Sequence, residues 1–241
     1  MLGLFKKEKL PPLSVGLHSH LIPGIDDGCK TTEQSIEILR QLEESGIQKV
    51  VTTPHIAMEF YPNTPEIIRK GLVKMQKAIK EANLSITLEA AAEYYLDQHF
   101  LSALRENDEM LTFGDNFLLF ETPFLSKPPF FDDAIFEMKA RGLQPVFAHP
   151  ERYQYIGENP ELLTQLKQKE ILLQLNAGSL AGAYTPAIKK MAHFMIRNNL
   201  VDFLGSDIHH ERHLKNFIAL RDSRDYQKLM ALPLLNDQLL N

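Results

Sequence analysis

The stretch GLHSHLIPGIDDG at residues 16–28 decides the fold that we expect for this chain. Apolar residues lead into His18 and His20, and Asp26 and Asp27 follow in a turn bounded by glycines. If the first part is a strand, both imidazoles point to one face, because side chains alternate along a strand. Two histidines at a strand end, followed by carboxylates on the next loop, are typical of a metal site. The alternative is a surface loop that happens to hold these residues, so the rest of the chain must decide.

The composition is that of an ordinary α/β protein without a nucleic-acid partner. The chain has 241 residues, of which 44% are hydrophobic, enough for one barrel or two small domains. A net charge of −5 gives no electrostatic reason to expect nucleic acid. No apolar run approaches the roughly 20 residues that span a bilayer. The single cysteine, Cys29, excludes an intramolecular disulfide. We therefore expect a cytoplasmic protein. Residues 1–13 precede the first predicted strand as an N-terminal extension, which is either a frayed terminus or an arm that touches a membrane.

Apolar strand segments alternate with amphipathic helices along the rest of the chain. Strands are predicted at residues 15–20, 47–53, 85–92, 116–120, 144–148, 171–175 and 201–206. Helix starts are predicted at Thr31, Thr64-Pro65, Asp132, Asn159-Pro160 and Thr185-Pro186, and a short helical piece is predicted at residues 97–105. This alternation indicates a parallel sheet covered by helices, and no glycine-rich phosphate loop follows the first strand. We predict a single-domain α/β barrel over residues 14–241 that ends in a helical region.

Potential metal ligands stand at the ends of six of the seven predicted strands. They are His18, His20, His55, Glu93, Glu121, His149, Asp207 and His209, and Asp27 follows on the first loop. A parallel barrel delivers the carboxyl ends of its strands to one rim, where such barrels carry their active sites. Each residue alone has a structural interpretation, but nine such groups on one rim would repel and lose hydration unless cations lay among them. His99, His193, His210 and His213 do not fit this pattern, and the first two fall within predicted helices.

The ligand set indicates more than one metal ion and a phosphate ester as substrate. Nine ligands exceed the roughly four to six that one transition metal takes, so we expect two or three ions, with Glu93 between them. Imidazole and carboxylate without thiolate suit Mn, Fe or Zn. Such sites generate a hydroxide nucleophile and hold a phosphoryl group during in-line displacement. Arg152 is placed to bind phosphate oxygens and Arg212 is a weaker candidate, whereas the alternative for Arg152 is a surface pair with an acid such as Glu151.

The ordered motifs resemble the polymerase-and-histidinol-phosphatase (PHP) superfamily of metallohydrolases. They are His18-Ser19-His20, Thr53-Pro54-His55, Glu93, Glu121, His149 and Ser206-Asp207-Ile208-His209. A finer resemblance, over about residues 14–230, is to the manganese-dependent bacterial protein-tyrosine phosphatases of capsule and exopolysaccharide loci. Its motifs are His18-Ser19-His20-x5-Asp26-Asp27-Gly28, Ala92-Glu93-Tyr94-Tyr95, Ala148-His149-Pro150-Glu151-Arg152-Tyr153 and Ser206-Asp207-Ile208-His209.

This resemblance implies a distorted (β/α)7 barrel, a three-ion Mn²⁺ site, and phosphotyrosine on a bacterial tyrosine kinase as substrate. It implies metal-ligand roles for His18, His20, Asp27, His55, Glu93, Glu121, His149, Asp207 and His209. Asp27, rather than Asp26, holds the ligand position of the family motif. The resemblance also implies that Arg152 binds the phosphate. Asp207 and His209 are further catalytic candidates, as groups that assist the leaving group.

We predict a phosphomonoesterase that hydrolyses phosphotyrosine by means of a metal-bound hydroxide. A cysteine phosphatase is excluded, because an arginine must follow the nucleophilic cysteine six positions on, and Ser35 stands there after Cys29. One alternative is a small-molecule phosphatase, for example one acting on histidinol phosphate. Another is a non-catalytic regulator that docks on a kinase, although the complete ligand set argues against it. A homo-oligomer is compatible with the sequence.

Overall fold

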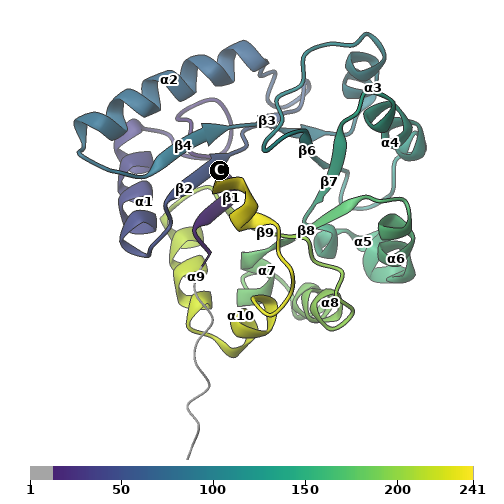
Figure 1. Cartoon of the computed structure of the whole chain (residues 1–241). Coiled ribbons are helices and arrows are strands. Elements are labelled where there is room, and N and C mark those ends of the chain that lie inside the picture. The colour runs from purple at the N-terminus through teal and green to yellow at the C-terminus, as the bar shows by residue number, and fades with distance from the viewer. Residues whose placement is uncertain (1–12, 241) are drawn as a thin grey trace, which may run out of the picture.

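In the computed structural model, which describes residues 13–240, a parallel sheet curls into a distorted barrel (Figure 1). Its strands are β1 (Val15–Ser19), β2 (Lys49–Thr52), β3 (His55–Ile56), β4 (Thr87–Ala90), β5 (Glu93–Tyr95), β6 (Phe117–Glu121), β7 (Gln144–Ala148), β8 (Leu172–Asn176) and β9 (Phe203–Ile208). Their order is β3-β5-β6-β7-β8-β9-β1-β2-β4. All neighbouring strands in this sheet are parallel, as the alternation of strands and helices predicts.

Two of the seven predicted strands, 47–53 and 85–92, are each continued by a second short strand beyond their predicted end. Residues 53–54 separate β2 from β3, where Pro54 has no N–H to donate to a neighbouring strand. Residues 91–92 separate β4 from β5. The pairing continues across both breaks, because Ala91 N donates to Thr52 O at 2.9 Å and Glu93 N donates to Pro54 O at 3.1 Å. Counted in this way, seven strands follow chain order around the barrel and β9 pairs with β1, so the predicted distorted (β/α)7 barrel is confirmed.

Helices cover the outside of the sheet (Figure 1). They are α1 (Thr32–Glu44), α2 (Pro65–Glu81), α3 (Gln98–Arg105), α4 (Phe131–Ala140), α5 (Gln154–Glu158), α6 (Glu161–Gln168), α7 (Ala177–Ala181), α8 (Pro186–Arg197), α9 (Glu211–Arg221) and α10 (Arg224–Leu229), with short 3₁₀ turns η1 (Pro150–Arg152) and η2 (Asn236–Leu240). The predicted caps of α1, α2 and α8 are confirmed. The side chains of Thr31, Thr64 and Thr185 each accept a hydrogen bond from the third backbone N–H beyond them.

Two predicted helix starts are wrong. Asp132 lies inside the first turn of α4, where its carboxylate forms ion pairs with Lys127 and Lys169 instead of capping the helix. Pro160 occupies the N-cap position of α6, and no side chain caps this helix by a hydrogen bond, so Asn159 is not its cap. The sequence also did not predict α5 and α7, because five residues carry too little periodicity to be recognised.

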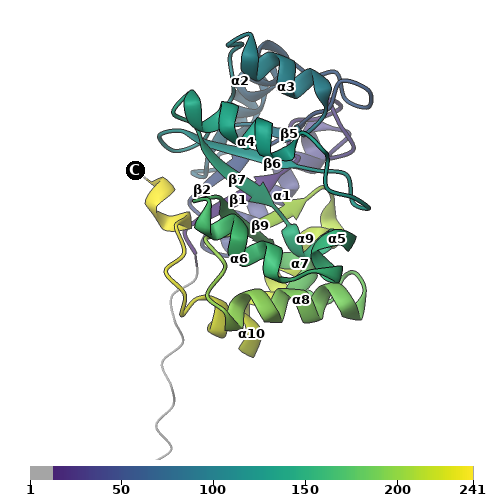
Figure 2. The same ribbon diagram turned by 90° about the vertical axis from the view of Figure 1, so that its right-hand side faces the viewer.

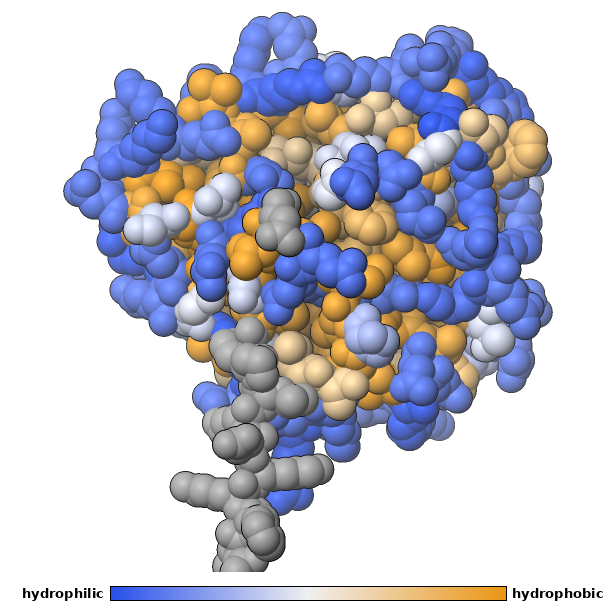
Figure 3. Space-filling model, viewed as in Figure 1, coloured by the Kyte–Doolittle hydropathy of each residue, from blue (hydrophilic) through white to orange (hydrophobic). Residues whose placement is uncertain are grey.

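The C-terminal segment closes the end of the barrel at which the strands begin (Figures 1 and 2). Asn236 is fully buried, and its side chain accepts from Leu204 N and donates to Leu204 O, both at 2.9 Å. Leu239 packs with Phe113 and Phe203 in the core inside the barrel. A second, larger core lies between the strands and the helices. On this face of the molecule, hydrophilic side chains dominate the outline and apolar ones show between them near the middle (Figure 3).

The predicted N-terminal extension falls mostly outside the described residues, which begin at Leu13. Leu13 itself is buried, and its backbone N–H donates to the hydroxyl of Tyr226 at 3.2 Å. Within residues 13–240, no helix has the length and apolar character that crossing a bilayer requires. The opposite end of the barrel, where the strands finish, is the one that carries the predicted ligands.

Candidate active site

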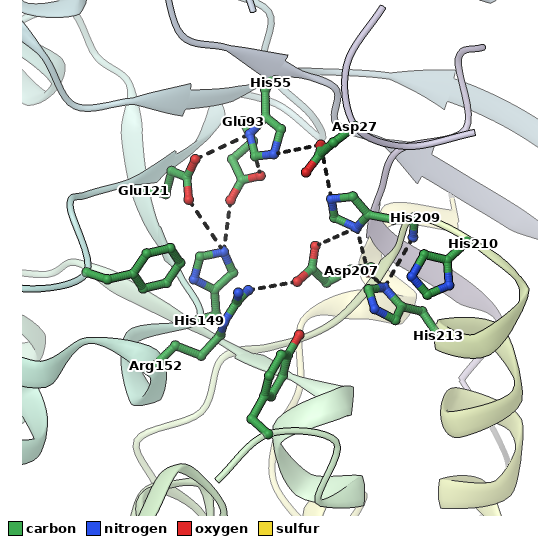
Figure 4. Close-up of a pocket in the computed structure, with 12 residues that line it drawn as sticks. Asp27, His55, Glu93, Glu121, His149, Arg152, Asp207, His209, His210 and His213 are labelled. Carbon is green, nitrogen blue, oxygen red and sulfur yellow. Dashed lines mark hydrogen bonds and ion pairs between the residues drawn. The ribbon is translucent and has the colours of Figure 1, made fainter. Parts of the chain in front are cut away.

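A pocket of about 360 Å³ lies at the carboxyl end of the barrel (Figure 4). It is lined by Asp27, His55, Glu93, Glu121, Phe124, His149, Arg152, Tyr184, Asp207, His209, His210 and His213. The two remaining predicted ligands, His18 and His20, are fully buried against Glu93 and Asp207. The structure therefore brings all nine residues together, although strands far apart in the sequence supply them.

Glu93 is the residue on which the cluster converges. Its Oε2 lies 3.0 Å from His18 Nε2 and 3.2 Å from His55 Nδ1, and its Oε1 lies 3.0 Å from His149 Nε2. Glu121 adds a second carboxylate, 3.3 Å from His55 Nδ1. A carboxylate that faces imidazoles from three other strands in this way has the geometry of a bridging ligand.

Four overlapping groups of side chains present ligand atoms within 4.8 Å of one another. They are His20, Asp27, His55 and His209; His18, Glu93 and His149; His18, His20 and Asp207; and His55, Glu93 and Glu121. The groups share members, as adjacent ions with bridging ligands require. Imidazole nitrogens and carboxylate oxygens without a thiolate fit Mn, Fe or Zn, so the residues fit the expected group of ions.

The backbone is irregular at three of the proposed ligands. The φ values of His18, His149 and Asp207 are 63°, 35° and 50°, in the left-handed region that residues other than glycine rarely adopt. The pairing of β1 with β9 shifts register between Leu17 and Ser19, on either side of His18. The rings of His18 and His20 lie together as expected, with centroids 5.5 Å apart, although the backbone at His18 departs from a regular strand. Conformations of this kind are concentrated at functional sites.

Outer partners orient the buried imidazoles. His18 Nδ1 donates to Gln174 Oε1 at 2.7 Å, and His20 Nδ1 donates to Asp26 Oδ2 at 2.8 Å. The Nε2 atom of each ring is thereby turned toward Glu93 and Asp207. Metal-binding histidines usually carry such a hydrogen bond on the other ring nitrogen.

Asp26 and Asp27 occupy different positions in the cluster. The carboxylate of Asp26 is buried and accepts from Gly28 N at 2.9 Å and from His55 N at 3.2 Å, besides its bond with His20. Asp27 is half-exposed, and its Oδ1 lies 3.5 Å from His55 Nε2 and 3.4 Å from His209 Nε2. Asp27 therefore faces the pocket, whereas Asp26 supports the residues that do.

The buried charges of the cluster shift the pKa values of its members in different directions. Although burial opposes it, the charges of His18 and His55 hold the pKa of Glu93 well below its usual range. Burial lowers the pKa of His18, but the charges of Glu93 and Asp207 outweigh it and raise that pKa to about 9. Burial, with the charges of His209 and His55, lowers the pKa of His20 to about 4, so this ring is neutral at pH 7. Its Nε2 is also buried without a hydrogen-bond partner among residues 13–240, as a free metal-binding lone pair would be.

Arg152 also lies in the pocket wall. Its Nη1 donates to Asp207 Oδ2 at 2.9 Å, and Asn176 Nδ2 donates to the same oxygen at 2.6 Å. The neighbouring acid, Glu151, is buried and instead accepts from Asn176 N at 3.0 Å. Arg152 is thus not a surface residue paired with Glu151. Arg212 is exposed and is not among the residues that line the pocket.

The pocket contains several residues that the strand-end pattern did not select. His210 and His213, which do not fit that pattern, line it, and His213 Nδ1 donates to Asp207 O at 2.9 Å. The sequence feature that could have identified them is their position one and four residues after His209, at the start of α9. Gln174 and Asn176 do not line the pocket but contact His18 and Asp207, and the sequence did not select them because an amide at a strand end has no distinctive pattern. His99 and His193 lie on α3 and α8, as predicted, outside the pocket.

Comparison with known proteins agrees with this geometry. The sequence model of the family "Capsular polysaccharide synthesis, CpsB/CapC" matches residues 14–225. The chain is 29% identical to the tyrosine-protein phosphatase YwqE of Bacillus subtilis over 204 residues, 84% of this chain and 80% of that protein. It is 29% identical to the putative tyrosine-protein phosphatase CapC of Staphylococcus aureus over 195 residues, 81% of this chain and 76% of that protein. 

A solved structure shows the same fold. It comes from a study of YwqE from Bacillus subtilis and CpsB from Streptococcus pneumoniae, described there as unique metal-dependent tyrosine phosphatases. Its TM-score with this chain is 0.79 at 27% identity, covering 93% of this chain and 94% of the other.

Proposed function

Because the chain belongs to the CpsB/CapC family of capsular polysaccharide synthesis proteins, we propose that it is a metal-dependent phosphatase acting on phosphotyrosine in proteins. The observation that carries this proposal is the convergence of nine imidazole and carboxylate side chains, Glu93 at their centre, with Arg152 beside them. The relatives named above as tyrosine-protein phosphatases support the choice of substrate.

We propose that the nine clustered residues hold two or three ions, with Mn²⁺ as the preferred metal and Fe or Zn as alternatives. The proposed ligands are His18, His20, Asp27, His55, Glu93, Glu121, His149, Asp207 and His209. Ions bound there would activate water and offset the charge that develops on the phosphoryl group. Their neighbours Asp26 and Gln174 orient two of the ligand rings by the hydrogen bonds described above.

Arg152 is the proposed phosphate-binding residue. Only its Nη1 is engaged with Asp207, so further guanidinium N–H groups remain for phosphate oxygens. The tyrosine hydroxyl has a pKa of about 10, so its phenolate is a better leaving group than an alkoxide and needs less protonation by an acid. Burial opposes ionisation of Asp207, but His18, His209 and Arg152 hold its pKa below the usual range. Asp207 is therefore ionised at neutral pH and suits a ligand better than a proton donor.

We further propose that the substrate is a tyrosine kinase of exopolysaccharide synthesis and that the reaction takes place in the cytoplasm, where such a kinase finds its ATP. A homo-oligomer is compatible with this proposal. A regulator that docks on the kinase without catalysis would have no need for a complete set of ligand side chains.

The test is hydrolysis of a phosphotyrosyl peptide by the purified protein, before and after chelation and after Mn²⁺ is restored. We expect chelation to abolish phosphate release and Mn²⁺ to restore it. His20→Ala removes a proposed ligand and should lower kcat/KM by at least about a hundredfold. His99→Ala, an exposed histidine on α3, is the matched control and should behave as the parent.

Three results would contradict the proposal: full activity after chelation, His20→Ala as active as the parent, or faster hydrolysis of histidinol phosphate than of the peptide. The last result would point to a small-molecule phosphatase. A protein that binds the metal and the kinase but releases no phosphate would be a docking regulator.

A further inference from the structure

Two aromatic residues, Phe124 and Tyr184, interrupt a pocket wall made otherwise of histidine, acidic and arginine side chains. Phe124 comes from the loop between β6 and α4, and Tyr184 from the loop between α7 and α8. The sequence pattern selected neither residue, because both lie in loops rather than at strand ends.

Both rings adjoin the proposed phosphate-binding residue. The Cζ atom of Arg152 lies 5.0 Å from the centre of the Phe124 ring and 4.7 Å from that of Tyr184. Phe124 also lies almost parallel to His149, with an angle of 19° and centroids 6.2 Å apart. It nevertheless keeps 43% of its surface exposed. The pocket thus has an exposed aromatic surface directly beside its phosphate-binding end.

A phosphate bound to Arg152 would lie beside these rings, where its organic substituent can contact them. In a phosphotyrosine, that substituent is a phenyl ring bonded to the ester oxygen, within reach of Phe124 and Tyr184. Aromatic rings attract one another at centroid distances of about 4.5–7 Å. In a phosphoserine, the ester oxygen carries a single methylene group, which offers far less apolar area to bury.

We infer that Phe124 and Tyr184 form an aryl subsite that packs against the phenyl ring of the substrate and makes the enzyme prefer aryl over alkyl phosphates. This inference rests on the proposed function, because it assigns the ring end of the phosphotyrosine whose phosphate Arg152 binds. A different role for the two rings is to hold the guanidinium of Arg152 in place by cation–π contact. That role would affect every phosphate ester equally, so the two roles can be separated by experiment.

The experiment measures Kd for phenylphosphonate and for methylphosphonate by calorimetry, with the metal-loaded protein. Neither compound can be hydrolysed, so the result does not depend on turnover. We expect the parent to bind phenylphosphonate about tenfold more tightly than methylphosphonate. Phe124→Ala and Tyr184→Leu should lose most of this preference by weakening phenylphosphonate binding alone. Phe124→Tyr retains a ring and should keep the preference.

Phe136→Ala, an exposed phenylalanine on α4 that does not line the pocket, is the matched control and should bind both compounds as the parent does. The inference is overturned if the parent shows no preference. It is also overturned if Phe124→Ala weakens both compounds equally, which would mean that the rings act only through Arg152. The peptide assay described above is a separate result: a parent that prefers the phenyl compound but hydrolyses no phosphotyrosine would contradict the proposed function and leave the aryl subsite standing.

Discussion

Asp26 and Asp27 are adjacent in the chain, yet their carboxylates meet different partners. Asp26 ties together His20, Gly28 and the backbone of His55, whereas Asp27 is half-exposed at the pocket. We therefore expect Asp26→Ala to lower the free energy of unfolding of the metal-free protein by about 3 kcal/mol, because buried donors lose their acceptor. Asp27→Ala should lower that free energy by less, because Asp27 is half-exposed, and should lower the amount of bound metal.

Urea unfolding of the metal-free variants, followed by metal analysis after loading, distinguishes the two aspartates. The assignment of Asp27 as ligand and Asp26 as support would be wrong if Asp26→Ala were as stable as the parent, or if Asp27→Ala bound the full amount of metal.

At the scale of elements, three neighbouring strands position His18. Gln174 on β8 holds the ring, and a Cβ at Gly205 on β9 would lie only 2.1 Å from Gln174 Nε2. Gly205→Ala should push Gln174 away from His18 and lower metal affinity about tenfold, as the loss of an outer hydrogen bond to a ligand does. Competition with a chelator of known affinity measures this change.

Gly16→Ala on β1 is the matched control, because its Cβ would meet Val50 Cγ2 at an ordinary 3.5 Å. Unchanged metal affinity in Gly205→Ala would mean that Gln174 has no part in orienting His18. A loss in Gly16→Ala of the same size would point to a general weakness of the strands instead.

At the scale of the whole molecule, the two ends of the barrel have separate tasks. Asn236 closes the end where the strands begin, through hydrogen bonds to both backbone groups of Leu204. We expect Asn236→Ala to lower the free energy of unfolding by about 2–3 kcal/mol, because it leaves buried backbone groups unpaired. KM for the phosphotyrosyl peptide should stay the same, since the site lies at the other end.

Denaturant unfolding and steady-state kinetics on the same preparation check this separation. A stable Asn236→Ala variant would contradict the closing role of the segment. A changed KM at unchanged stability would show that the two ends are coupled.

The sequence by itself determined the parallel barrel and the identity of the clustered residues. The alternation of apolar strands with helices is a local pattern, and parallel strands bring their carboxyl ends to one rim wherever the chain forms such a barrel. The local sequence alone therefore places His149 at the end of a strand, whereas its partners come from distant parts of the chain. The caps Thr31, Thr64 and Thr185 are local in the same sense, since each depends on backbone groups three residues away.

Only the tertiary structure decided what depends on contacts between distant residues. Aspartate is a residue type that often caps helices, but the carboxylate of Asp132 forms ion pairs with Lys127 and Lys169 instead. The irregular backbone at His18, the bond from Gln174, and the place of Phe124 and Tyr184 beside Arg152 follow from the way strands and loops pack. None of these carries a local pattern, because an amide or an aromatic ring gains its role from the partner it meets across the fold. The residue types in the stretch 16–28 thus predict a metal site, whereas the packing of the barrel determines where each of their side chains lies.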